Sequence, residues 1–301
     1  MPLALLFPGQ GSQVVGMGKS LCDTSAVARH VFEEADAVLG FPLSRLCFEG
    51  PEEDLKQTAN TQPAILTHSV AAWRDLEERD PGRVEGAAFT AGHSLGEYSA
   101  NVAAGALVFA DALRLVRRRG ELMQDAVPPG VGAMAAILGL PPGEVEAACR
   151  DAAQGEVVAP ANYNSPEQTV IAGHAEAVAR ASALCTERGA KRAIALPVSA
   201  PFHCALMAPA RERMKPLLEA AAFRDARIPI VTNVDAVPAS SGAALRDALI
   251  RQIDLPVRWV DSVRRLSAEG VVAGLELGPG NVLAGLVRRI EKALKVESYG
   301  G

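Results

Sequence analysis

The chain has 301 residues, of which 49% are hydrophobic and only 4% aromatic, so it can fill a core with small aliphatic side chains and is neither disordered nor collagen-like. Its formal net charge of -5 argues against a general attraction to nucleic acid or to an anionic membrane surface. The five cysteines include no CxxC pair, which argues against a disulfide framework and a zinc site, and we expect neither a metal nor a cofactor.

The first predicted element is a buried strand over residues 3–7, which a glycine-rich loop over residues 8–13 follows. Because the start lacks a positively charged segment, we interpret it as a strand and not as a signal peptide. No apolar run approaches the roughly 18 residues that a membrane span needs, so we expect a cytoplasmic protein. The loop matches neither the phosphate-loop nor the dinucleotide-binding pattern. Gln10, which glycines flank, could offer a main-chain N–H to a reacting carbonyl; an ordinary glycine turn is the alternative.

A possible nucleophile follows the next predicted strand. Helical patterns cover about residues 26–39, 64–78, 96–104 and 110–124, and a small-residue run over 86–91 predicts a strand. Between that strand and the third helix lies Gly92-His93-Ser94-Leu95-Gly96, a G-x-S-x-G sequence in the strand–turn–helix context of a nucleophile elbow. The turn would project the Ser94 hydroxyl outward and place the Leu95 N–H at a helix N-terminus, where a developing oxyanion is stabilised. The pattern alone is weak, and a tight turn that merely contains serine is the alternative.

An arginine lies inside the apolar stripe of the helix predicted over residues 110–124. Arg119 falls on the face of Leu115 and Met123, whereas Arg114 and Arg118 fall on the opposite, solvated face. A buried guanidinium needs an anionic partner, and its planar fork matches a carboxylate in a bidentate geometry. The sequence leaves two partners open: an internal carboxylate, or the carboxylate of a ligand.

The middle of the chain has a different order of elements. Strand patterns over residues 133–138, 157–162, 168–172 and 192–198 alternate with helical patterns over residues 143–153 and 176–188. The order βαββαβ is typical of a ferredoxin-like unit. We predict that residues 128–197 form a small domain inserted into a large domain of residues 1–127 and 198–301. Alternating strands and helices in the large domain favour an α/β fold with a parallel sheet.

Among the five histidines, His203 is the preferred general base. It follows Pro201-Phe202 in an irregular loop after a predicted strand, where catalytic groups gather in α/β folds. A loop histidine is more often a surface or capping group, but an activated serine elsewhere in the chain favours a catalytic role. His93 adjoins Ser94, and neighbouring side chains in such a turn point apart. The remaining histidines have no evident chemical partner: His30, His68 and His174.

Together these stretches resemble the malonyl-CoA:acyl carrier protein transacylase family of fatty-acid and polyketide synthesis. They occur in family order from residue 5 to about residue 290, and the combination is far more specific than any single motif. The matching stretches are Phe7-Pro8-Gly9-Gln10-Gly11-Ser12-Gln13, Gly92-His93-Ser94-Leu95-Gly96-Glu97-Tyr98-Ser99-Ala100, Arg119-Gly120, Met123-Gln124, Asn162-Tyr163-Asn164-Ser165-Pro166, Ile171-Ala172-Gly173, Pro197-Val198-Ser199, His203, Asn233-Val234, Gln252 and Glu276-Leu277-Gly278-Pro279-Gly280.

The resemblance implies an α/β-hydrolase-like large domain with a ferredoxin-like insertion, in agreement with the pattern of predicted elements. It implies that Ser94 is the nucleophile, that His203 is the base and that Arg119 holds the malonyl carboxylate. It further implies ping-pong transfer of malonyl from malonyl-CoA, through an ester, to the phosphopantetheine thiol of an acyl carrier protein, without metal or redox cofactor.

The same resemblance implies supporting roles for four further residues. Main-chain N–H groups of Gln10 and Leu95 would form the oxyanion hole, and the main-chain carbonyl of Gln252 would orient the histidine in place of a triad aspartate. Phe202 departs from members that carry a small residue before the histidine. In related polyketide acyltransferases, a phenylalanine there accompanies malonyl over methylmalonyl.

An acyl carrier protein is expected to be acidic, so we expect a locally basic docking surface despite the overall charge. The candidate pairs are Arg117-Arg118, Lys191-Arg192 and Arg288-Arg289. Two alternatives stay open. A serine hydrolase would share the elbow, although such enzymes usually place the histidine late and none follows His203. A catalytically silent docking subunit is the other alternative, and the intact set of Ser94, Arg119 and His203 argues against it.

Overall fold

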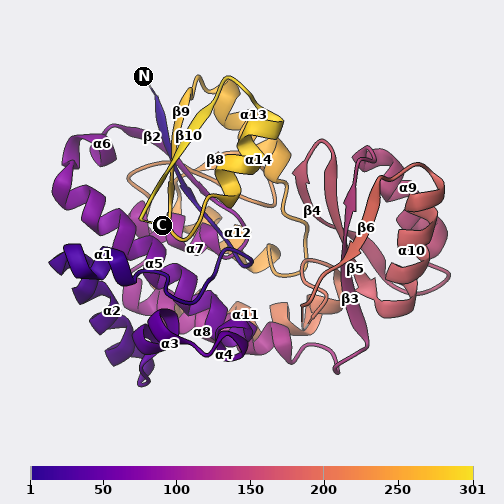
Figure 1. Ribbon diagram of the computed structural model, residues 1–301, viewed down its shortest axis with the longest axis horizontal. Coiled ribbons are helices and arrows are strands. Elements are labelled where there is room, and N and C mark those ends of the chain that lie inside the picture. Colours follow the sequence, from indigo (N-terminus) through magenta and orange to yellow (C-terminus); the bar gives the residue numbers. More distant parts are fainter. Residues whose placement is uncertain (1, 199, 301) are drawn as a thin grey trace.

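The computed structural model describes residues 2–198 and 200–300; Ser199, which belongs to one matching stretch, lies outside the described residues, as do both end residues. Figure 1 shows a larger α/β part, which contains the first and last strands, beside a smaller part with its own sheet. Within the described residues, no helix combines the length and apolar character that crossing a membrane requires.

A six-stranded sheet in the order β10-β9-β1-β2-β7-β8 forms the centre of the larger part. All neighbouring pairs are parallel except β7 and β8. The strands are β1 (Leu3–Phe7), β2 (Ala87–Gly92), β7 (Ile230–Val231), β8 (Pro238–Ala239), β9 (Ala273–Leu277) and β10 (Lys295–Tyr299). Every residue of β1 is buried, as its unbroken apolar sequence predicts for a strand that is covered on both faces.

Helices cover both faces of this sheet, so alternate side chains of β1 enter two separate cores. Leu5 and Phe7 pack in one core with α2, α5, α7 and α8, while Ala4 and Leu6 pack in the other with α13 and α14. The helices are α1 (Lys19–Thr24), α2 (Ala26–Leu39), α3 (Leu43–Glu49), α4 (Glu52–Lys56), α5 (Thr58–Arg79), α6 (Pro81–Glu85), α7 (Gly96–Ala103), α8 (Phe109–Gln124), α11 (Ala208–Ala220), α12 (Gly242–Arg251), α13 (Trp259–Ala268) and α14 (Val282–Ile290), with a short 3₁₀ turn at Ala205–Met207.

The contact between α5 and α8 brings Arg119 into the interior. A Cβ atom on Gly120 would lie 2.7 Å from the Cα of Ala59, so only glycine allows the two helices to lie this close. Helix α5 begins at Thr58, six residues before the start that the sequence predicts, and it contains Pro63. Proline cannot donate a hydrogen bond to the carbonyl four residues before it. Here the Ala59 carbonyl accepts from Nη1 of Arg117 instead, at 3.0 Å.

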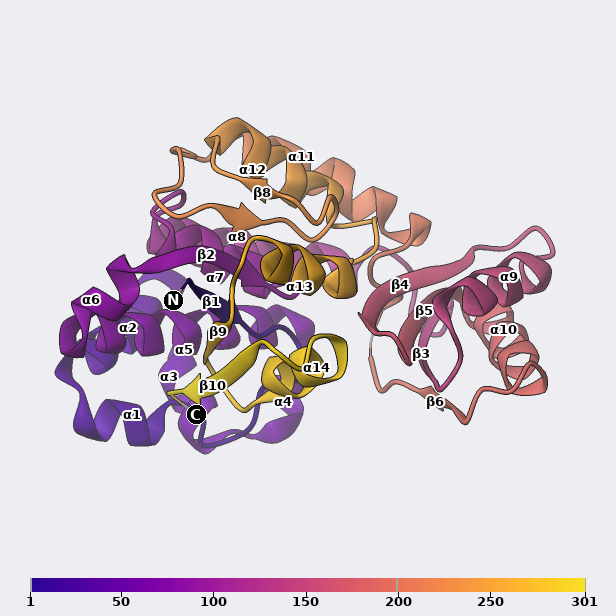
Figure 2. The ribbon, with the colours of Figure 1, turned by 90° about the horizontal axis from the view of Figure 1, so that it is seen from above.

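The smaller part has a four-stranded antiparallel sheet in the order β4-β5-β3-β6. Its elements are β3 (Gly132–Leu138), α9 (Pro142–Ala152), β4 (Val158–Ser165), β5 (Gln168–His174), α10 (Ala175–Glu187) and β6 (Arg192–Ala195). Figure 2 shows α9 and α10 together on one face of this sheet, and the two helices share a separate apolar core with it. The predicted ferredoxin-like βαββαβ unit is therefore confirmed, although β6 is shorter than predicted. We propose that residues 128–197 constitute this domain.

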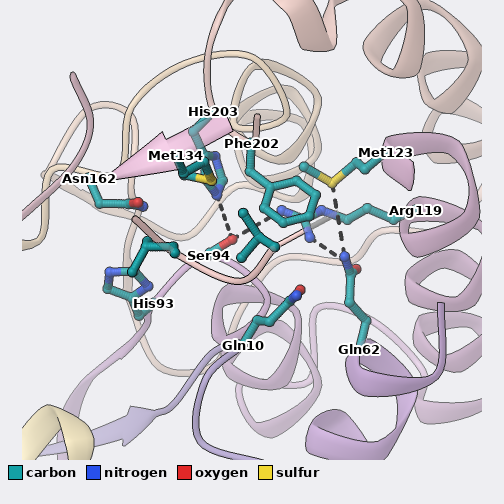
Figure 3. A pocket seen from close by; sticks show the side chains of 12 residues that line it. Gln10, Gln62, His93, Ser94, Arg119, Met123, Met134, Asn162, Phe202 and His203 are labelled. Carbon is teal, nitrogen blue, oxygen red and sulfur yellow. Dashed lines mark hydrogen bonds between the residues drawn. The ribbon is translucent and has the colours of Figure 1, made fainter. Parts of the chain in front are cut away.

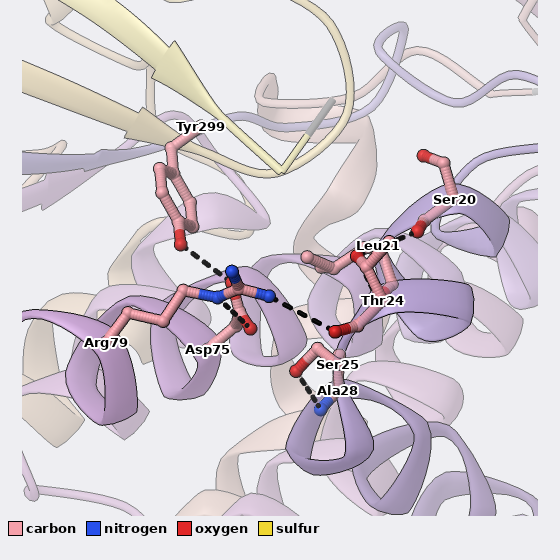
Figure 4. A network of polar contacts seen from close by, with 8 residues as sticks. All are labelled: Ser20, Leu21, Thr24, Ser25, Ala28, Asp75, Arg79 and Tyr299. Carbon is pink, nitrogen blue, oxygen red and sulfur yellow. Dashed lines mark hydrogen bonds and ion pairs between the residues drawn. The ribbon is translucent and has the colours of Figure 1, made fainter.

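Polar contacts fix the last strand, β10, on α5. The Tyr299 hydroxyl donates to Oδ2 of Asp75 at 2.7 Å, and Nε of Arg79 donates to Oδ1 of the same buried carboxylate at 2.9 Å (Figure 4). Burial alone would raise the pKa of Asp75, but hydrogen bonds from Ser25, Tyr299 and Arg79 outweigh it and lower the pKa. The edge strand β10 is thus joined to α5, which also packs against α8, the helix that carries Arg119.

Candidate active site

Ser94 lies in a strained turn between β2 and α7. Its φ is 51°, a left-handed conformation that serine seldom adopts. A Cβ on Gly92 would lie 2.0 Å from the carbonyl carbon of Gly96, and a Cβ on Gly96 would lie 2.0 Å from the Phe7 carbonyl oxygen. Glycine at both positions therefore allows the helix to start directly against the ends of β1 and β2, which is the geometry of a nucleophile elbow.

His203 is positioned to receive the Ser94 proton. The Ser94 Oγ lies 2.7 Å from Nε2 of His203, and Nδ1 of the same ring lies 2.8 Å from the main-chain carbonyl oxygen of Gln252. A carbonyl can only accept, so the proton of a neutral ring resides on Nδ1 and the Nε2 lone pair faces the serine hydroxyl. Like Ser94, His203 has a positive φ, of 58°.

Burial keeps this histidine neutral. It is the largest influence on the pKa of His203 and, together with the positive charge of Arg119, lowers the pKa to about 3, although the hydrogen bond to Gln252 acts in the opposite direction. A neutral imidazole is the form that can accept a proton, so the ring is ready to act as a base throughout the physiological pH range.

Arg119 lies beside this pair and is 1% exposed. Its Nη2 donates to Oε1 of Gln252 at 2.8 Å and to Oγ of Ser94 at 3.2 Å, and its Nη1 donates to Oε1 of Gln62 at 3.0 Å. Its Nε has no hydrogen-bond partner within the described part of the chain. Arg119 also forms no direct ion pair with any described carboxylate, so the sequence's first alternative, an internal salt bridge, is not made by direct contact.

Two amide side chains clamp the turn around Ser94. Oδ1 of Asn233 accepts from the Ser94 main-chain N–H at 2.7 Å, and its Nδ2 donates to the Gly92 carbonyl at 2.6 Å. Nε2 of Gln252 donates to the Ser94 carbonyl at 2.9 Å. The main-chain N–H groups of Gln10 and Leu95, by contrast, make no hydrogen bond to another described group. They are free to donate to a ligand.

Ser94, His203 and Arg119 line a cavity of about 110 Å³ between the larger and smaller parts (Figure 3). Met123 from α8, Met134 from β3 and Phe202 are the larger apolar side chains of its lining. The full lining is Gln10, Gln62, His93, Ser94, Arg119, Met123, Met134, Asn162, Leu196, Val198, Phe202 and His203. The space suits a small acyl group that carries a negative charge at its far end.

The structure brings the predicted Ser94, His203, Arg119, Gln10 and Phe202 to this one cavity. Leu95 adjoins Ser94, and Gln252 contacts the reacting groups from behind. His93 is hydrogen-bonded to Asn164 at 2.8 Å and has no bond to the Ser94 hydroxyl.

Gln62 and Met134 also line the cavity, although the sequence did not predict them, and Asn233 and Glu97 lie behind it without a predicted role. A buried polar residue on the apolar face of a helix, such as Gln62, is the signal that could have revealed the first of these.

The chain is similar over nearly its whole length to known acyltransferases. The family model described as "acyl transferase domain" matches residues 4–299. The malonyl CoA-acyl carrier protein transacylase of Escherichia coli (strain K12) is 51% identical over 97% of this chain and 93% of its own, and that of Bacillus subtilis (strain 168) is 49% identical over 97% and 92%.

Two solved structures are also similar to this chain. One is an acyl carrier protein S-malonyltransferase from Vibrio cholerae, 52% identical with a TM-score of 0.96 over 99% of this chain and 96% of its own. The other is a malonyl-transacylase in complex with its type II polyketide synthase acyl-carrier protein, 48% identical with a TM-score of 0.96 over 99% and 96%.

Proposed function

The chain belongs to the acyl transferase family, among the malonyl-CoA:acyl carrier protein transacylases, and from that premise we propose that Ser94 carries the malonyl group during transfer. One observation supports this assignment above all. The Ser94 hydroxyl lies within hydrogen-bond distance of both the Nε2 atom of His203 and the Nη2 atom of Arg119, inside a single cavity. A base and a carboxylate-binding group thus meet at one nucleophile.

In the proposed first step, His203 takes the hydroxyl proton as Ser94 Oγ attacks the thioester carbonyl of malonyl-CoA. The oxyanion that forms accepts hydrogen bonds from the N–H groups of Gln10 and Leu95. When the tetrahedral intermediate collapses, the carbon–sulfur bond breaks, and coenzyme A leaves with the proton that His203 returns. The product is a malonyl ester on Ser94.

The second step reverses the first with a different thiol. His203 takes the proton of the carrier protein's phosphopantetheine thiol as the sulfur attacks the Ser94 ester. The carbon–oxygen bond breaks, and Ser94 recovers its proton from His203. Neither step requires a group other than the two substrates and this chain's own residues.

Arg119 would bind the free malonyl carboxylate. The unpartnered Nε and the Nη2 bonded to Ser94 are two donors of one planar fork, which suits bidentate binding of a carboxylate. Phe202 lies in the same cavity, where its ring would restrict a branched acyl group. Malonyl is therefore the acyl group that this site fits best.

For the acidic carrier protein, we propose a docking surface at the end of α14. Arg117 and Arg118 both pair with Glu121, which weakens that candidate. Arg288 instead lines a groove of about 320 Å³ with Lys292 and Lys295. The exposed side chains of this α14 basic surface make no ion pair with any described residue, and the surface comprises Arg288, Arg289, Lys292 and Lys295. The predicted pair Lys191-Arg192 is also unpaired among the described residues but lies on the smaller part.

A cytoplasmic location belongs to the same proposal. All five cysteines are buried and free, as is usual in a reducing compartment. Burial raises the pKa of Cys204, which adjoins His203, to about 11, so this thiol does not compete with Ser94 as a nucleophile.

The test of function separates transfer from hydrolysis. Purified protein should release coenzyme A from malonyl-CoA rapidly when holo acyl carrier protein is present. In water alone it should release one equivalent of coenzyme A and then almost none, because the Ser94 ester reacts with a thiol and not with water. Continued release in water at a rate near that of transfer would identify a serine hydrolase. No release under either condition would favour the silent docking subunit.

A further inference from the structure

Glu97 is a buried carboxylate directly behind the proposed nucleophile. It lies in the first turn of α7 and is fully buried. Its Oε2 accepts from the Asn233 main-chain N–H and from Nε2 of Gln252, both at 2.9 Å. Its Oε1 has no hydrogen-bond partner among the described residues. A carboxylate with one free oxygen in a dry interior is costly and needs a nearby positive charge.

The nearest positive charge on this network belongs to Arg119, and Gln252 connects the two groups. One end of the Gln252 side-chain amide donates to Glu97, and the other end accepts from Nη2 of Arg119 at 2.8 Å. Because Glu97 accepts from the Gln252 NH₂ group, the Gln252 carbonyl oxygen is the end that faces the guanidinium. Arg119 and Glu97 therefore form a charge pair with one amide between them.

We propose that Glu97 is the internal counter-ion of Arg119 and that its charge sets how strongly the site binds a carboxylate-bearing acyl group. This inference rests on the proposed function, in which the malonyl carboxylate binds Arg119. While Glu97 is ionised, the pair is neutral before malonyl binds. When the malonyl carboxylate binds, two buried anions share one cation. The ionised form of Glu97 is then much less stable than before. Malonyl binding should therefore place a proton from solvent on Glu97.

The other charged and titratable groups around Glu97 do not replace it in this role. Asp235, on the loop after β7, disfavours a charge on Glu97 but is itself held by Arg251 at 2.7 Å. His203 is neutral, and burial raises the pKa of Tyr98 to about 12, so neither carries charge near pH 7. Arg119 remains as the cation that stabilises the carboxylate.

The pKa of Glu97 is consistent with proton uptake when malonyl binds. Burial raises it to about 7, against the opposing influence of the hydrogen bonds from Asn233 and Gln252 and of the charge on Arg119. If malonyl binding requires a proton on Glu97, each pH unit above that pKa weakens binding by a factor of ten. At about pH 8 the penalty is about tenfold, and near pH 6 it vanishes.

The experiment measures binding and proton uptake together, in a Ser94→Ala background that cannot form the ester. Malonyl-CoA is titrated calorimetrically in two buffers of different ionisation enthalpy, at about pH 8 and about pH 6. We expect uptake of about one proton at the higher pH only. Acetyl-CoA, which has the same coenzyme A but no carboxylate, should cause no such uptake.

Glu97→Gln supplies the decisive variant because its carbonyl oxygen can still accept from Asn233 and Gln252. It should bind malonyl-CoA about tenfold more tightly than its parent at about pH 8 and equally near pH 6, without proton uptake. The matched control is Glu276→Gln. Glu276 is also fully buried and accepts from two main-chain N–H groups, of Leu283 at 2.9 Å and Ala284 at 2.8 Å, away from the cavity. The Glu276→Gln variant should change neither the affinity for malonyl-CoA nor the proton uptake.

Two results would overturn the inference: no malonyl-specific uptake at about pH 8 in the parent, or uptake that persists in Glu97→Gln. The first measurement holds even if the Glu97 variant does not fold. Adding Arg119→Ala separates this failure from failure of the proposed function. If malonyl-CoA binds equally with and without Arg119, the carboxylate site itself is wrong; if binding needs Arg119 but takes up no proton, only the counter-ion is wrong.

Discussion

At the scale of single residues, three side chains from distant parts of the chain divide the proposed chemistry. In this proposal Ser94 supplies the nucleophile, His203 the base and Arg119 the charge that distinguishes malonyl from acetyl. They are coupled, because the positive charge of Arg119 also lowers the pKa of His203. A change at Arg119 should therefore alter both substrate choice and the pH dependence of acylation.

Arg119→Ala should cut kcat/KM for malonyl-CoA by at least about a hundredfold, the usual cost of losing a charge-assisted bidentate partner. It should spare or raise kcat/KM for acetyl-CoA, which has no carboxylate to offer the buried guanidinium a bidentate partner. Arg119→Lys should recover part of the malonyl activity, since lysine has the charge without the fork. Steady-state kinetics on both thioesters measure the ratio. A constant ratio, or equal loss with instability, would mean that Arg119 is purely structural.

The pH profile tests the neutral base. Acylation needs neutral His203, and a base with a lowered pKa stays neutral as the pH falls. The acid limb of kcat/KM for acetyl-CoA, which reports the free enzyme, should therefore lie well below pH 6.5, the ordinary value for histidine. Arg119→Ala removes one cause of the lowering and should move that limb to higher pH. A parent limb at the ordinary histidine value would contradict the assignment.

At the scale of elements, the elbow depends on how closely α7 approaches the ends of β1 and β2. Gly96→Ala places a methyl group 2.0 Å from the Phe7 carbonyl oxygen, so the helix start must move. We expect loss of acylation and a markedly lower melting temperature. Gly143→Ala is the matched control, because a Cβ in that first helical turn meets nothing within 4 Å. Equal behaviour of the two variants in activity and thermal unfolding would argue against a sterically defined elbow.

The elements differ in how far their sequences specify them. The helix predicted over about residues 26–39 forms with those bounds, and Ser25 caps it by accepting from the Ala28 N–H. The prediction lacks the first turn of α5, since Pro63 signals a break and the sequence does not show that Arg117 from α8 donates to the carbonyl that Pro63 leaves free. Residues 40–57 and 205–299 gave no predicted elements. Short pieces such as the two-residue strand β7 depend on neighbours distant in sequence, whereas the amphipathic helices α13 and α14 have a local pattern that the prediction overlooks.

The residues of the proposed site also differ in how far the local sequence predicts them. Ser94 lies in a local motif, and the position of Arg119 on an apolar face is visible in one helix. The roles of Gln62, Asn233 and Glu97 arise only when α5, the loop after β7 and α7 meet around the cavity. No local sequence pattern predicts these contacts between segments that are distant in the chain.

At the scale of the whole molecule, a net charge of -5 coexists with an unpaired basic surface at α14. Arg288→Glu should lower kcat/KM for the carrier protein several-fold at low salt, and the loss should fade as salt screens the interaction. Lys191→Glu, at an exposed and unpaired lysine of the smaller part, should have little effect. Transfer kinetics over a salt series provide the measurement. Salt-independent transfer, or equal loss in both variants, would contradict docking at α14.

The claim on which the rest depends is that Ser94 holds the malonyl group, and intact-mass spectrometry after mixing with malonyl-CoA tests it most directly. The parent protein should gain the mass of one malonyl group, and holo acyl carrier protein should remove it. Ser94→Ala should gain none while unfolding at the parent's temperature, since the turn accepts a smaller side chain. A malonyl adduct on Ser94→Ala, or a parent that transfers malonyl without ever carrying it, would contradict the account.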